Sequence, residues 1–194
     1  MSGLISVWLV LVFVIFLGPL LSHSPTLGND LIRYTIRLAL VYYAVALTLL
    51  LRANRIDLQK SSSIIRLART CWTLAWLTYL VHLAMAFHYA HGWSHADAIR
   101  HTEEVSGFGP GIFVSHFFTL VWTADVAARW LAPQRYAGRP AWMDWTLHIF
   151  MLFVVFNGTV VFETGLIRWA GVAMFAWLAG WMIIGRGLKQ AGPV

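Results

Sequence analysis

Histidines are the residues of this chain best suited to chemistry, and they are concentrated in one stretch. Six of the eight lie between positions 82 and 116, namely His82, His88, His91, His95, His101 and His116. An imidazole can bind a metal ion or exchange a proton near neutral pH. Because the stretch begins inside an apolar segment, where ionisable groups are costly and usually functional, we expect a ligand, metal or proton site there.

One assignment of these histidines is a haem b site. His82 or His88 on one span, with His116 on the next, could supply its two axial ligands. At 1.5 Å per residue, His82 lies roughly 12 Å, His88 roughly 3 Å and His116 roughly 8 Å inside the outer edge of the spans. Arg37, six residues inside another span, could neutralise a propionate or simply extend its charge to the surface.

A second assignment is a site for a bare metal ion, built from His88, His91, His95 and His101. His91 and His95 have the i,i+4 spacing that chelates a metal, provided that the helix continues past Gly92. Imidazole suits copper, iron and zinc, and carboxylates would favour iron or zinc over Cu(I). The nearby carboxylates are Asp97, Glu103 and Glu104. The remaining alternative is that these histidines are solvated hydrogen-bonding groups on an exposed loop.

A second polar group, Asp125 and His148, lies deeper along the predicted spans. Both residues are roughly 21 Å from the outer surface, so a hydrogen bond between them could offset the cost of burying the carboxylate. Arg129 follows Asp125 by one turn and could instead hold it in an i,i+4 ion pair. We favour this structural role over a proton relay.

The elements that must position these residues are membrane-spanning helices. Hydrophobic residues make up 59% of the 194 positions and charged residues 11%, and a span needs roughly 20 predominantly apolar residues. We therefore predict an all-α integral membrane protein with residues 1–194 in a single domain. Its six spans are expected at about 4–22, 31–51, 64–90, 111–131, 142–162 and 165–187. The first is expected to be a retained helix, since Met1-Ser2-Gly3 lacks the basic residues of a signal peptide.

Charge predicts how the spans are oriented. Ten of the 14 Lys and Arg residues lie on one side of the spans and four on the other. This bias predicts cytoplasmic termini in an inner membrane and a histidine-rich loop on the periplasmic side. Ser94 and Asp97 form a capping pattern, so a short helix over about 95–105 is expected at the outer interface. The basic charge is thus explained by topology, and we expect lipid and other membrane subunits or further copies as partners, not nucleic acid.

Two of the predicted spans resemble those of six-helix ferric-reductase-like haem b proteins. One reads Arg66-x-x-Arg69-x-x-Trp72-x-x-x-Trp76 and leads to His82, and another opens with Trp145-x-x-His148. The resemblance implies haem b and electron transfer between a quinone or flavin and an outer acceptor. The chain departs from that family where Val161 replaces a second histidine of the fifth helix, and His116 has no counterpart there.

Together these patterns predict an outward-facing centre of haem b, copper, iron or zinc with a redox or metal-handling role. Whether the protein is an enzyme is left open. A cofactor-free accessory subunit of a larger membrane complex and a small transporter of metal ions or protons are the alternatives. The single Cys71 excludes an intramolecular disulfide, and no C-x-x-C-H motif is present for covalent haem attachment.

Overall fold

Membrane-length helices dominate the structure, a computed structural model that describes residues 2–53 and 62–190. Within those ranges six helices are long and apolar enough to span a membrane, which confirms the six predicted spans. They are α1 (Ser2–Leu21), α2 (Leu27–Arg52), α4 (Ser63–Met85) extended by the π-helical turn Ala86–Ala90, α6 (Gly111–Leu131), α8 (Ala141–Phe156) extended by the π-helical turn Asn157–Val161, and α9 (Gly165–Gln190).

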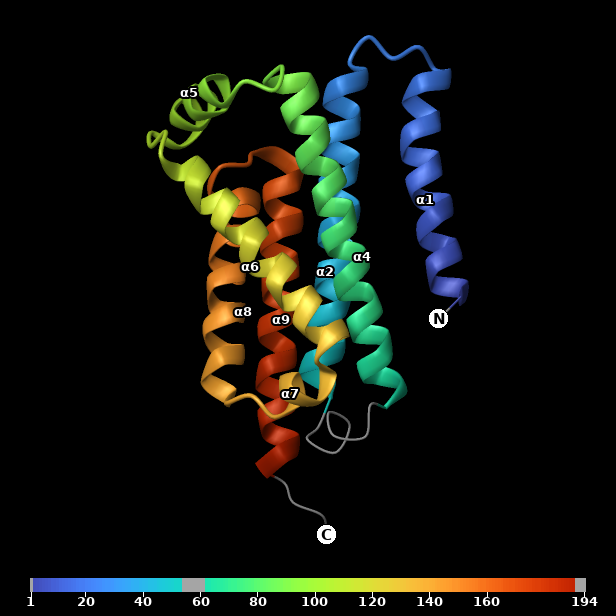
Figure 1. Ribbon diagram of the computed structural model, residues 1–194, viewed down its shortest axis with the longest axis vertical. Coiled ribbons are helices and arrows are strands. Elements are labelled where there is room, and N and C mark those ends of the chain that lie inside the picture. The colour runs from blue at the N-terminus through green and yellow to red at the C-terminus, as the bar shows by residue number, and fades with distance from the viewer. Residues whose placement is uncertain (1, 54–61, 191–194) are drawn as a thin grey trace.

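The long helices run side by side, and the two short helices of the described residues, α5 and α7, lie at opposite ends of the bundle (Figure 1). The helix α7 (Pro133–Ala137) lies at the end of the bundle that is nearer to the start of α1 and to the last turns of α9. We call this the terminal end. The helix α5 (His95–Ser106) lies at the other end, which we call the histidine end. The two candidate polar sites therefore lie at different ends of one bundle.

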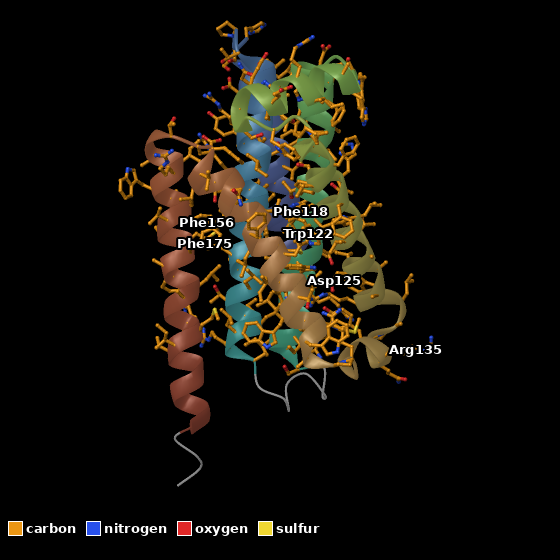
Figure 2. All side chains as sticks on the ribbon, turned by 90° about the vertical axis from the view of Figure 1, so that its left-hand side faces the viewer. Phe118, Trp122, Asp125, Arg135, Phe156 and Phe175 are labelled. Atoms are coloured by element: carbon orange, nitrogen blue, oxygen red, sulfur yellow. The ribbon has the colours of Figure 1, made fainter. Side chains whose placement is uncertain are left out.

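Four helices meet at one fully buried indole. Trp72 of α4 is 0% exposed. Its ring centre lies 5.5 Å from that of Tyr43 of α2, 5.3 Å from Trp122 of α6 and 5.5 Å from His148 of α8. Such aromatic contacts add to the energy of burial itself. Figure 2 shows Trp122 beside Phe118 on the stretch of α6 that leads towards the terminal end and Asp125.

Tryptophan–threonine hydrogen bonds join neighbouring helices at several levels. Each indole N–H donates to a threonine hydroxyl of another helix: Trp8 to Thr78 at 2.8 Å, Trp76 to Thr123 at 3.0 Å, Trp130 to Thr73 at 2.9 Å and Trp177 to Thr48 at 3.1 Å. Each of these hydroxyls in turn donates to the carbonyl four residues earlier in its own helix. This arrangement satisfies polar groups that lipid cannot, because hydrocarbon offers no hydrogen-bonding partner.

The predicted short helix exists, and its ends follow ordinary capping rules. The Ser94 hydroxyl accepts a hydrogen bond from the Asp97 N–H at 3.2 Å, and α5 closes at Gly107 with a φ of 73°. Its position at a membrane surface remains a prediction. The helix before it ends at Ala90, because Gly92 and Trp93 take the left-handed φ values of 52° and 62°.

Replacing Trp72 with alanine should lower the free energy of unfolding by about 3–5 kcal/mol, because the cavity forms where four helices meet. Denaturant-induced unfolding of the purified protein in detergent measures the loss. The matched control is Trp142→Ala, because the Trp142 side chain is 65% exposed. A loss as small as that of the control would contradict the central role of Trp72.

Candidate functional sites

The histidine end brings together His95 and His116, which were placed in different sites by the sequence. Their Nε2 atoms lie 3.2 Å apart, although His95 opens α5 and His116 is on α6. Two zinc–nitrogen bonds of about 2.0–2.1 Å at a tetrahedral angle would place the nitrogens about 3.3 Å apart. The observed distance fits two ligands of one metal ion as well as it fits a hydrogen bond.

Backbone carbonyls fix the proton of His116 and of His82. The Nδ1 of His116 lies 2.6 Å from the carbonyl oxygen of Ile112, and that of His82 lies 3.0 Å from the carbonyl of Ile32. A carbonyl oxygen only accepts, so the proton of each neutral ring is on Nδ1 and the Nε2 lone pair is free to act as an acceptor or ligand. The same second contact orients metal-bound histidines in proteins.

Phe87 lies at the centre of the histidine end. Its ring centre is 5.7 Å from that of His91, 5.3 Å from that of His95 and 6.4 Å from that of His116. His91 also lies against His101, with ring centres 5.4 Å apart. Burial and the neighbouring His101 hold the pKa of His91 below its ordinary value, while Asp97 acts in the opposite direction.

The predicted chelation by His91 and His95 from a single helix is wrong in its premise. That helix would have to continue past Gly92, and it ends at Ala90. His91 and His95 instead pair with His101 and His116 respectively. Within residues 2–53 and 62–190, no three His, Cys, Asp or Glu side chains converge as a complete metal site.

The remaining members of the predicted haem set have separate partners. Trp93 donates from its indole nitrogen to Nδ1 of His88 at 3.3 Å. The Arg37 side chain is exposed, and its guanidinium lies 5.6 Å from the ring centre of Tyr34, one turn earlier. His82, His88 and His116 line neither the cavity at the terminal end, described below, nor the cavity between α1 and α2.

At the terminal end, Asp125 is the centre of a charged network. Its side chain is 2% exposed and accepts from Arg129 at 2.7 Å, from the Tyr136 hydroxyl at 2.8 Å and from Arg139 at 3.2 Å. Arg139 also donates to Asp144, at the start of α8. The predicted ion pair between Asp125 and Arg129 is confirmed, and the network ties α6 to α7 and α8.

The network keeps its loop residues in their usual protonation states. Burial, opposed by Arg129, raises the pKa of the Tyr136 hydroxyl, so this group remains a donor to Asp125. Burial lowers the pKa of Arg139, but Asp144, Tyr136 and Asp125 outweigh that effect and raise it above its ordinary value. Arg129 and Arg139 are therefore balanced by Asp125 and Asp144, two charges of each sign.

His148 lies beside this network without joining it. Its contact is the edge of the Trp72 ring, and its buried Nδ1 atom has no hydrogen-bond partner in the described part of the chain. His148 also lines a cavity of about 560 Å³ at the terminal end, together with Arg69 of α4. The predicted hydrogen bond from His148 to Asp125 is replaced by the three donors that already surround the carboxylate.

Sequence reasoning missed Tyr136, Arg139 and Arg69 as site residues. Arg139 and Asp144 stand five residues apart at the start of a predicted span, a spacing that could have indicated an ion pair. No feature of the sequence around Tyr136 indicates that α7 brings the Tyr136 hydroxyl to Asp125 of α6. Arg69 was recognised only as part of a charge count and of a pattern resembling haem proteins.

Comparisons with known proteins supply no further constraint. No family model, known relative or solved structure matches the chain. The likeness of two spans to ferric-reductase-like proteins gains no support from these comparisons. Any function must therefore be argued from the geometry of the two ends.

Replacing Asp125 with asparagine should lower the free energy of unfolding by about 3–5 kcal/mol, because it leaves the buried Arg129 without its counter-charge. Detergent-solubilised variants can be compared by thermal or denaturant unfolding. Asp97→Asn is the matched control, since Asp97 pairs with Arg100 on an exposed helix face and should cost less than about 1 kcal/mol. Equal losses in the two variants would contradict the network's structural role.

Proposed function

We propose that this integral membrane protein binds a transition-metal ion between His95 and His116 and serves in metal handling or redox chemistry. The observation that carries the proposal is the 3.2 Å approach of two Nε2 atoms from separate helices. The carbonyl of Ile112 directs the His116 lone pair towards this point, as an outer-shell acceptor does at metal sites.

The donor set favours copper, iron or zinc. Imidazole nitrogen suits these ions better than magnesium, calcium or manganese, which prefer oxygen ligands. Two protein ligands leave coordination positions for water or for a molecule that delivers or removes the ion, as metal handling requires. His91 lies against Phe87 and His101 lies against His91, so these two imidazoles could meet an ion on its way to or from the pair.

The charge bias favours an orientation in which the histidine end lies on the periplasmic side of an inner membrane. In that orientation the metal would be exchanged on the periplasmic side, and the terminal end would face the cytoplasm. The haem b alternative uses His116 with His82 or His88, and it predicts a Soret band in the absorption spectrum of the purified protein. The accessory-subunit and transporter alternatives have no specific observation in their favour.

Titration with Cu²⁺ or Zn²⁺ after chelator treatment tests the proposal. The purified protein should retain one ion after desalting, measured by elemental analysis. His95→Ala and His116→Ala should each weaken binding by more than the about 10–100-fold that loss of an outer-shell partner costs. His23→Ala is the matched control, because His23 is an exposed histidine whose contact is the carbonyl of Leu21.

Two outcomes would contradict this function. If the wild-type protein retains neither ion, the His95–His116 contact is a hydrogen bond alone. If His23→Ala weakens binding as much as His116→Ala, the ion is held by scattered surface histidines. A Soret band that is lost when His116 and either His82 or His88 are both replaced would favour haem instead.

A further inference from the structure

A cavity of about 560 Å³ opens among the helices at the terminal end, at the opposite end from the histidine pair. Its walls are mostly apolar, with leucines from α2, α8 and α9 that include Leu47, Leu152 and Leu178. Its polar lining includes Arg69, Arg129, Asp144 and His148. This combination of an apolar chamber and a few convergent polar groups is typical of ligand sites.

The charges of the described residues that line the cavity do not balance. Arg129 is paired with Asp125, and Asp144 is paired with Arg139. Arg69 has no carboxylate within ion-pair distance among the described residues. Among the residues that the structure describes, one positive charge therefore faces the cavity without a counter-ion, which is costly within a membrane-spanning segment and marks a functional position.

The Arg69 side chain is held by two contacts, and one of its donors has no partner among the described residues. Its guanidinium carbon lies 4.1 Å from the ring centre of Trp130, whose indole N–H is anchored on Thr73. One terminal nitrogen approaches the carbonyl oxygen of Arg129 at 3.5 Å. The buried Nε has no hydrogen-bond partner in the described part of the chain, and neither does the buried Nδ1 of His148 on the other wall.

Two buried nitrogens without partners in one cavity indicate what the occupant must supply. A buried polar group that lacks a partner costs free energy, and an acceptor oxygen would remove that cost at the Arg69 Nε–H, and at His148 Nδ1 in the tautomer that carries the proton there. The planar guanidinium is suited to carboxylate or phosphate oxygens, which also supply the missing negative charge. The apolar walls require a hydrocarbon portion.

We propose that this cavity binds an anionic membrane amphiphile, its carboxylate or phosphate oxygens at Arg69 and His148 and its hydrocarbon tail along Leu47, Leu152 and Leu178. A fatty acid and an acidic phospholipid share this chemistry. The site would let the protein respond to, or be stabilised by, acidic lipid on the side opposite to its histidine end.

Native mass spectrometry of the full chain in detergent tests this proposal with three probes: oleate, phosphatidylglycerol and zwitterionic phosphatidylcholine. One equivalent of oleate or phosphatidylglycerol should bind more tightly than phosphatidylcholine, and whichever of the two binds identifies the source of the oxygens. Arg69→Gln should weaken that binding about tenfold, since a hydrogen bond to a charged group is lost. Arg52→Gln removes a charge on α2, near the same end, from a residue outside the cavity lining, and should leave binding unchanged.

Two further variants guard against a simple folding defect. Arg69→Lys keeps the charge but not the planar donor geometry and should fall between the wild type and Arg69→Gln. Met182→Trp fills the cavity without touching either polar group and should also abolish tight binding. Equal affinity for all three probes, or equal loss in Arg69→Gln and Arg52→Gln, would overturn the proposal.

Discussion

The burial of the Asp125 carboxylate constrains the whole terminal end. A carboxylate within a membrane-spanning helix must be compensated, and three donors from α6, α7 and the loop that follows do so. Meeting this requirement draws α7 back under α6 and fixes the start of α8 through Arg139 and Asp144. Because Arg129 is paired with Asp125, Arg69 is the cation that faces the neighbouring cavity without a carboxylate partner among the described residues.

Many polar groups elsewhere in the bundle meet the same requirement by different means. Four indole donors, those of Trp8, Trp76, Trp130 and Trp177, are paired with threonine hydroxyls of neighbouring helices. The neutral His82 and His116 rings direct Nδ1 protons at backbone carbonyls. Some buried polar atoms of the described residues still lack a partner, and two of them, Arg69 Nε and His148 Nδ1, belong to side chains that line the terminal cavity. At the histidine end, a neutral His116 turns its Nε2 lone pair towards His95. Lone pairs suit a metal cation, and donors suit an anion. The two ends of the bundle thus offer opposite chemistry.

Much of the fold could be predicted from the sequence because hydrocarbon thickness sets helix length. The span predicted at 111–131 is reproduced as Gly111–Leu131, and the short helix predicted at 95–105 appears as His95–Ser106 with Ser94 as its cap. The pairing of histidines could not be predicted in the same way. It depends on Gly92 and Trp93 taking left-handed conformations, which turn α5 so that His95 meets His116 instead of His91.

The charged network around Asp125 shows the same limit of prediction from the sequence. The i,i+4 pair of Asp125 and Arg129 is local and was predicted, whereas Tyr136 and Arg139 reach Asp125 through a loop whose path depends on tertiary packing. The unbalanced charge on Arg69 becomes visible only after the carboxylates of the described residues near it, Asp125 and Asp144, have been assigned to other cations. Local spacing therefore identifies pairs within a helix, and the three-dimensional structure identifies what remains unpaired.

X-ray absorption spectroscopy of the zinc-loaded protein tests the central claim most directly. We expect a first shell at about 2.0–2.1 Å that includes two histidine imidazoles, with the remaining positions filled by oxygen. The imidazole scattering should fall by half in His116→Ala, since one of the two rings is removed. A spectrum without imidazole scattering, or one unchanged by that substitution, would contradict a metal site between His95 and His116.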